Sequence, residues 1–171
     1  MPTFSDSEIE CHVFTFKEGV LSGVAHDLKL RVARASVTLA EDSVVATFDP
    51  KSLSVVCARK EGQDSPDTLS AGDKKKIEAN IAKDVLHTRK HTEIRFASTA
   101  IDRDGDRATI TGDLTLHGQT RPIRATATKK GGRWETEVSI HQPDFGIKPY
   151  SAMLGALKVQ PNVKVRFSVP A

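Results

Sequence analysis

The chain has 171 residues, of which 38% are hydrophobic, and its 25 basic and 22 acidic side chains give a net charge of +3. That length suits one domain, residues 1–171, which on folding buries about 70% of the surface of the unfolded chain and needs no disulfide or metal. The two signs of charge are interspersed, which indicates a solvated surface and excludes nucleic acid as an expected partner.

No stretch approaches the roughly 18 apolar residues of a membrane-spanning helix. The first residues have neither the basic nor the apolar region of an export signal, so we expect a cytoplasmic protein that does not span a membrane. Cys11 falls in a predicted strand and Cys57 opens a polar loop, without the spacing of a zinc site. We therefore expect two free thiols rather than a disulfide, with no metal and no cofactor.

The first third of the chain alternates between apolar and polar residues, as half-buried strands do. Strands are predicted at residues 9–16, 26–32, 36–39, 44–48 and 53–56, with polar turns between them. In the second of these, His26 shares the apolar face with Leu28, Leu30 and Val32. The short spacing is typical of a barrel or a sandwich.

Residues 58–72 hold too few apolar side chains to pack, so we expect a mobile loop there. Residues 73–86 then place Ile77, Ile81 and Val85 four apart among strong helix formers. This pattern predicts one helix that packs across the β domain by a single narrow apolar stripe.

The clearest hairpin covers residues 107–128. Its first arm carries Ile110, Leu114 and Leu116 on one face, and Gly112 interrupts that face, which predicts a bend or a bulge. His117 and the glycine after it supply the turn.

Two further strands place apolar residues on one parity, and a short segment at residues 150–155 is predicted to form a helical turn. The apolar residues of these last two strands are Trp134, Val138 and Ile140, then Val163, Val165, Phe167 and Val169.

The sequence contains no GxSxG, HExxH or phosphate-binding loop. Four histidines fall on polar parities or in connections, where solvated side chains are expected: His12, His87, His91 and His141. His26 and Asp27 are neighbours in a strand, so they point to opposite faces and form no dyad. We therefore predict no catalytic residue.

Two inward residues allow two interpretations each. His26 is either a hydrogen-bonded core residue or a group that orients a ligand among apolar walls. Trp134 is either core or a platform on which a ligand stacks. Spacing alone does not choose between them.

Three motifs carry a family resemblance: F-A-S-T-A-I from Phe96, G-D-L-T-L-H-G-Q-T-R-P-I from Gly112, and D-F-G-I-K from Asp144. Together with V-L-H-T-R-K-H-T-E-I-R-F from Val85, they are similar to the YceI-like family over nearly the whole chain. The resemblance implies an all-β fold, an antiparallel, lipocalin-like extended β-barrel of about eight strands with one α-helix packed across it. It also implies an elongated apolar cavity that holds an isoprenoid chain.

On this basis we expect a non-enzymatic protein that binds, transports or sequesters a polyisoprenoid or a similar lipid, and the sequence is compatible with a homodimer. Two alternatives stay open: an enzyme that uses His26 on a small hydrophobic substrate, and a fully packed barrel that acts as a stress-related interaction module. The predicted ligand-binding residues, nearly all on inward apolar parities, are His26, Leu28, Leu30, Ile110, Leu114, Leu116, Trp134, Val138, Ile140 and Phe167.

Overall fold

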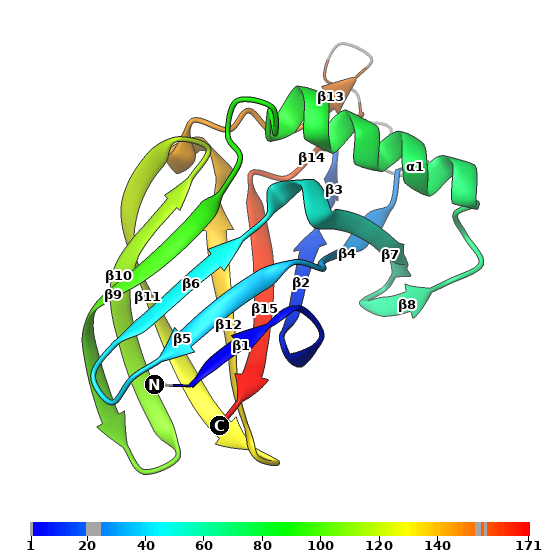
Figure 1. Ribbon diagram of the computed structural model, residues 1–171. Helices are drawn as coiled ribbons and strands as arrows, with labels where there is room; N and C mark the ends of the chain where they lie inside the picture. The colour runs from blue at the N-terminus through cyan, green and yellow to red at the C-terminus, as the bar shows by residue number, and fades with distance from the viewer. Residues whose placement is uncertain (1, 20–24, 153–154, 156) are drawn as a thin grey trace.

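The computed structural model describes residues 2–19, 25–152, 155 and 157–171. A curled antiparallel sheet forms a half-barrel, and one helix lies across one of its ends (Figure 1). Both chain ends lie near the opposite end of the half-barrel. None of the helices in the described ranges is long and apolar enough to cross a membrane.

Twelve strands form the main sheet, in the order β1-β5-β6-β9-β10-β11-β12-β15-β2-β4-β7-β8, and three short strands form a second sheet in the order β13-β14-β3. The strands are β1 (Thr3–Ser5), β2 (Glu10–Thr15), β3 (Lys17–Glu18), β4 (Asp27–Val32), β5 (Ala35–Leu39), β6 (Val44–Phe48), β7 (Leu53–Lys60), β8 (Gln63–Ser65), β9 (Ile94–Asp104), β10 (Arg107–Leu116), β11 (Gln119–Lys130), β12 (Arg133–His141), β13 (Ser151–Ala152), β14 (Leu157–Val159) and β15 (Asn162–Pro170). The helical segments are α1 (Ala71–Asn80), the π-helical turn η3 (Ile81–Val85), and the 3-10 turns η1 (Asp6–Glu8), η2 (Pro50–Ser52) and η4 (Gln142–Phe145).

The expected all-β, lipocalin-like architecture is confirmed, although the sheet has more strands than the expected eight. The difference arises because one long hairpin is bent in the middle: β4 pairs with β7, and β5 pairs with β6. At the bend, the Ala33 amide donates to the Ser52 carbonyl at 3.3 Å and the Asp49 amide donates to the Arg34 carbonyl at 3.0 Å. Eight strands remain when β4 with β5 and β6 with β7 are each counted as one bent strand and the short β1 and β8 are left out.

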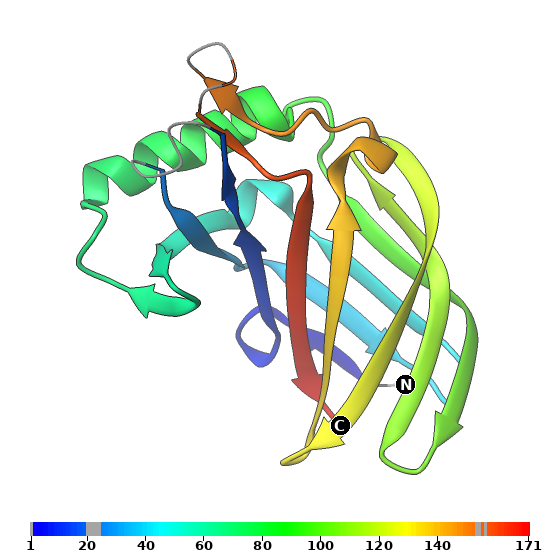
Figure 2. The ribbon, with the colours of Figure 1, turned by 180° about the vertical axis from the view of Figure 1, so that it is seen from behind.

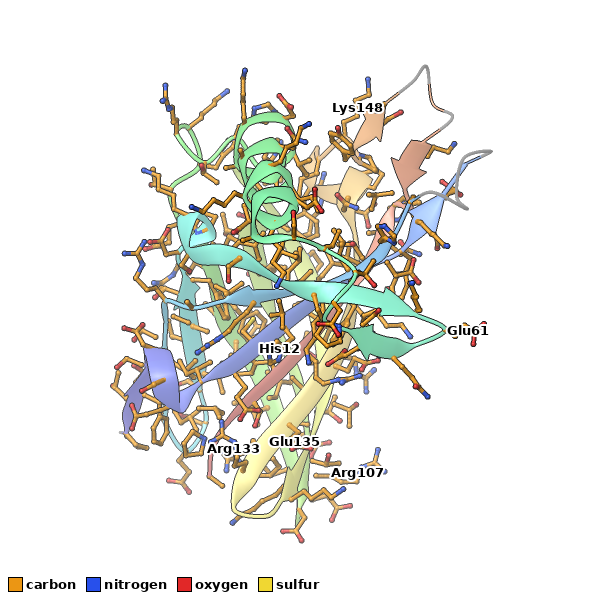
Figure 3. The ribbon with its side chains drawn as sticks, turned by 90° about the vertical axis from the view of Figure 1, so that its right-hand side faces the viewer. His12, Glu61, Arg107, Arg133, Glu135 and Lys148 are labelled. Carbon is orange, nitrogen blue, oxygen red and sulfur yellow. The ribbon has the colours of Figure 1, made fainter. Side chains whose placement is uncertain are left out.

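Period-two alternation correctly predicted which side chains face inward. β12 and β15 pair so that Trp134 lies opposite Val169, and Val138 lies opposite Val165. These side chains are buried or half-buried, whereas the intervening Glu135 is exposed and points away from the sheet (Figure 3). The reason is geometric, because successive side chains of a strand leave on opposite faces.

Gly112 lies at the predicted irregularity. The register between β9 and β10 shifts between Thr111 and Gly112, so Thr99 is the extra residue of a bulge. A Cβ on Gly112 would come within 2.5 Å of both the Ala97 carbonyl oxygen and Cζ of Phe96. The absence of a side chain at residue 112 therefore lets the Phe96 ring lie over β10 at the bulge.

The helix begins at a capping box. The Ser70 hydroxyl accepts from the Asp73 amide, and the Ser70 amide donates to the Asp73 carboxylate, both at 3.0 Å. The predicted single apolar stripe is corrected, because the winding changes to π after α1. Ile77 and Ile81 pack on the cluster of Leu28, Leu30 and Val55, whereas Val85 packs with Leu114, Ile140, Phe145 and Ile147.

Two predicted segments differ from the structure. Residues 58–72 are not wholly a loop: β7 continues to Lys60 and pairs with β8, with the turn residue Glu61 projecting at its tip (Figure 3). Cys57 consequently lies inside a strand, buried, and not at a loop opening. The expected helical turn at 150–155 is replaced at its start by the two-residue strand β13, and residues 153 and 154 lie outside the described ranges.

Candidate functional site

The inner face of the half-barrel is apolar, and some of its side chains keep accessible surface. A band of inward-facing residues is only half-buried: Val13, Phe96, Ile110, Leu116, Val138, Val165 and Phe167. In a fully packed small barrel such residues are buried, because interiors reach the density of organic crystals. The band spans the length of the barrel, since Phe96 and Val165 contact both the cluster near the chain termini and the cluster near η4.

The structure divides the predicted ligand-binding residues into two groups. The buried ones belong to the packed walls: Leu28, Leu30, Leu114 and Ile140. The half-buried ones present surface to the interior or to an end of the half-barrel: Ile110, Leu116, Trp134, Val138 and Phe167. The second group is therefore the part of the prediction that accessible apolar surface supports.

His26 lies one residue before β4 and is half-buried. Its charge acts on Asp73 at the start of α1, whose pKa is lowered chiefly by hydrogen bonds from Ser70 and to a smaller extent by Lys76 and His26. His26 thus sits beside the helix that covers the end of the barrel.

The wall of the barrel is open between β11 and β12. These strands pair over only four residue pairs in the described chain, from Ala127–Thr136 to Lys130–Arg133, whereas β12 and β15 pair over nine. The two strands meet near the chain termini and splay apart toward η4 (Figure 2). We call this gap in the ladder, between residues 119–126 and 137–141, the seam. η4 lies beside its wide end, where Nε of Arg121 donates to the Asp144 carbonyl at 3.1 Å.

Two surface hollows flank the barrel. One of about 420 Å³ lies between α1 and the bend of the long hairpin and is lined by Lys51, Leu53, Glu78 and Ile81 among others. The other, of about 310 Å³, lies near the chain termini and is lined mainly by apolar atoms, including those of Trp134. Trp134 is the one predicted ligand-binding residue that lines either hollow.

The two free thiols expected from the sequence are confirmed. Burial raises the pKa of Cys11 to about 12, so this thiol is protonated at neutral pH and is a poor nucleophile. Within the described ranges, no three His, Cys, Asp or Glu side chains are arranged to hold a metal ion. The interior itself presents apolar side chains. A surface of this kind can take an apolar molecule out of water.

One constellation was missed by the sequence analysis. His87 is exposed, as expected, and His91 is half-buried. Both rings lie near that of His117, with centroid distances of 5.5 and 4.3 Å. The Lys90 and His91 amides both donate to the His87 carbonyl at 3.0 Å, so residues 87–91 form a tight turn. The four-residue spacing was a usable signal for this pair, but it gave no indication of the turn at His117.

Fold and interior together define a lipocalin-like domain, a curled antiparallel half-barrel with an apolar inner face. The YceI-like domain family matches residues 5–171, and the chain belongs to this family. It is 40% identical over 76 residues to protein YceI of Escherichia coli O157:H7, a match over 38% of this chain and 39% of that protein. It is 37% identical over 92 residues to a UPF0312 protein of Pseudomonas putida (strain W619), over 47% of this chain and 48% of that protein. The chain therefore spans less than half the length of these curated relatives.

Solved structures share the fold at low sequence identity. BcnA of Burkholderia cenocepacia superposes with a TM-score of 0.66 at 16% identity and covers 96% of this chain and 97% of its own. A polyisoprenoid binding domain from Saccharophagus degradans, implicated in plant cell wall breakdown, superposes with a TM-score of 0.62 at 12% identity over 98% of both chains. A Campylobacter jejuni YceI protein carrying a monobromobimane guest gives 0.63 at 14% identity, over 86% of this chain and 85% of its own.

Proposed function

We propose that this protein binds a long apolar molecule, such as a polyisoprenoid, along the interior of the half-barrel and releases it chemically unchanged. The observation that carries the proposal is the band of inward, apolar and half-buried side chains. Phe96 and Val165 contact both interior clusters, and every residue of the band leaves some surface accessible. Such surface is unfavourable in water and becomes favourable when a hydrocarbon covers it.

The magnitudes are sufficient without any polar anchor. Burial contributes about 0.8 kcal/mol per methylene, so a five-carbon isoprene unit contributes about 3–4 kcal/mol when fully covered. Association costs about 4–15 kcal/mol, which two to five covered units offset. A chain molecule therefore suits this interior better than a compact one, because its affinity grows with the length that the barrel covers.

The seam supports a lateral route for such a chain. A rigid, closed wall would admit a long molecule only end-on, whereas the splayed halves of β11 and β12 need not break ladder hydrogen bonds to separate further. The similarity to a polyisoprenoid binding domain supports the choice of ligand class. The proposed role is a carrier or sequestering protein.

The test uses the single tryptophan as a reporter. Titrating the protein with farnesol and with a long-chain polyprenol should change the fluorescence of Trp134, and the longer alcohol should bind more tightly. The variant Val138→Glu places a carboxylate in the interior and should weaken binding by about tenfold or more. The matched control Ser139→Glu adds the same charge to the exposed face of the same strand and should stay within about twofold of wild type.

Binding that is equal in the two variants would refute the interior site. Mass spectrometry of the lipid recovered after incubation gives a second, independent readout. A carrier returns the added polyprenol unaltered, whereas a new product formed by wild type and lost in His26→Gln would favour the enzyme interpretation.

A further inference from the structure

Three segments that are distant in sequence meet at His117. This residue opens the tight turn between β10 and β11, and the turn lies beside η4 and the connection that follows η3 (Figures 1 and 2). The His91 ring presses on this turn so closely that a Cβ on Gly118 would come within 2.9 Å of its Cε1 atom. We call His87, His91 and His117 the histidine cluster.

Two residues of the cluster have an unusual backbone conformation. His117 and His87 both adopt left-handed backbone conformations, with φ of 55° and 48°. Asparagine or glycine holds such a conformation with less strain, and an Asn-Gly pair is the preferred sequence for a two-residue hairpin turn. Strained backbone of this kind is most often found where side chains serve a further purpose.

The hydrogen bonding of His117 requires a neutral ring. Its Nε2 atom is buried and has no hydrogen-bond partner among the described residues. The other nitrogen, Nδ1, faces the end of η4, since a Cβ on Gly146 would lie 4.0 Å from it. In the neutral tautomer that carries its proton on Nδ1, Nε2 keeps its lone pair. A second proton on Nε2 would be buried without an acceptor, which is an unfavourable state.

The titratable groups that contact or lie nearest the His117 ring become cations when protonated. Burial lowers the pKa of His117, and the neighbouring His91, His87 and Lys90 lower it further, against the opposing bond to Phe145. The causes named for this shift include no carboxylate. The other charged groups on the elements around the cluster are all exposed: Arg89, Glu93, Asp113, Arg121, Asp144 and Lys148.

The cluster is connected to the seam. His117 contacts the end of η4 at Gly146, so the cluster joins the β10–β11 turn to η4. η4 is also held to β11 at the wide end of the seam by the bond from Arg121 to the Asp144 carbonyl. Phe145 and Val85 also share one buried apolar cluster, so the same contact reaches the end of the helical segment that covers the barrel. If His117 moved away from η4, both η4 and the end of the helical segment at Val85 would therefore be loosened.

We propose that the histidine cluster is an acid-sensitive latch: closed at neutral pH, it opens when protonated, frees η4 from the β10–β11 turn, and widens the seam so that a bound apolar ligand leaves. The release step rests on the proposed function, whereas the opening itself does not. The direction of the pH dependence follows from the linkage between proton binding and closure. Because His117 binds a proton less readily when folded, the closed form is favoured above about pH 6.5 and loses that advantage as the pH falls.

The test measures opening and release separately. Amide hydrogen exchange at Gly146 and Ile147, whose amides donate to Pro143 and Gln142 carbonyls in η4, reports opening without any ligand. After correction for intrinsic rates, wild type should exchange there measurably faster near pH 5.5 than near pH 7.5, because protonation of His117 favours the open form. Release is followed in parallel by the fluorescence of Trp134 with bound polyprenol.

The decisive variant is His117→Asn, because asparagine suits the turn and does not titrate. It should fold, exchange at the same corrected rate at both pH values, and hold polyprenol at acid pH. The variant His91→Gln removes a neighbouring cation, so the titration of His117 followed by NMR should move to higher pH. The control His141→Gln removes an exposed histidine outside the cluster and should respond to acid like wild type.

Three outcomes overturn the proposal: wild-type exchange that is unchanged by acid, acid opening that persists in His117→Asn, and opening that leaves bound polyprenol in place. If polyprenol fails to bind at either pH, the proposed function fails. The exchange experiment on the free protein still decides whether the latch opens.

Discussion

Replacing Gly112 with alanine is expected to destabilise the protein, although the same change usually stabilises a strand or a helix. The φ angle of Gly112 is not in the left-handed region, so alanine meets no backbone barrier there. Its methyl group, however, would come within 2.5 Å of a backbone oxygen of β9 and of the Phe96 ring. Both contacts are far shorter than atoms tolerate, and the ring lies between two apolar clusters.

The magnitude combines two opposing terms. Added volume in a packed interior costs about 1–3 kcal/mol, while the lower entropy of the unfolded alanine chain returns about 0.4–1 kcal/mol. We expect a net loss of about 1–2 kcal/mol, which for a domain of this length lowers the melting temperature by about 2–8 °C.

Urea unfolding followed by circular dichroism measures this loss. The matched control is Gly72→Ala in α1, where the nearest atom to the new methyl is Oγ of Ser70 at 3.7 Å. That variant should gain about 0.5–1 kcal/mol from helix propensity. In a Phe96→Leu background, Gly112→Ala should cost less, and whatever cost remains belongs to the contact with the backbone of β9.

A Gly112→Ala protein as stable as wild type would refute the close packing of Phe96 at the bulge. If Gly112→Ala lowers the stability equally in the wild-type and Phe96→Leu backgrounds, the whole loss comes from the contact with the β9 backbone and none from the Phe96 ring.

Cys11 should resist alkylation at neutral pH until the protein unfolds, because burial raises its pKa to about 12, and rapid labelling of folded protein would contradict this. Burial, followed by nearby cations, lowers the pKa of His12, so its neutral form favours the fold above about pH 6.5 and this contribution is lost as the pH falls. The urea midpoint of His12→Gln should accordingly fall less on acidification than that of wild type. Arg166 lies 4.8 Å from the ring centroid of Phe14, so Arg166→Met should cost about 0.5–1 kcal/mol. Lys164→Met, in the same strand, removes an exposed charge without such a ring contact and should cost less, as denaturant titrations of the two variants would show.

The sequence by itself determined the inward face of each long strand. In β12 and β15 the alternation around Val138 and Val165 was sufficient, because the period of two is a local property of extended backbone. Gly112 was equally readable, since a missing side chain in the middle of an apolar face marks a bulge. The family motifs then supplied the barrel, which alternation alone does not distinguish from other curved sheets.

Only the tertiary structure decided how far each strand extends and what each polar segment meets. The end of β7 is polar, yet it forms a hairpin with β8 because Arg59 covers Phe14, a buried ring on the outer face of the sheet. No pattern within residues 58–72 contains that contact, since its partner lies more than forty residues earlier in the chain. The π-helical turn η3 likewise divides an apolar stripe that is continuous in sequence.

The seam and the histidine cluster were both beyond sequence reasoning for the same physical cause. Where two strands separate depends on the twist and closure of the whole sheet. In the sequence, β11 and β12 look like ordinary neighbouring strands, although they pair only in part. His87 and His117 lie thirty residues apart and looked like a solvated connection and a turn. Their contact exists because the chain after η3 and the β10–β11 hairpin end at the same edge of the barrel, which local propensities do not encode.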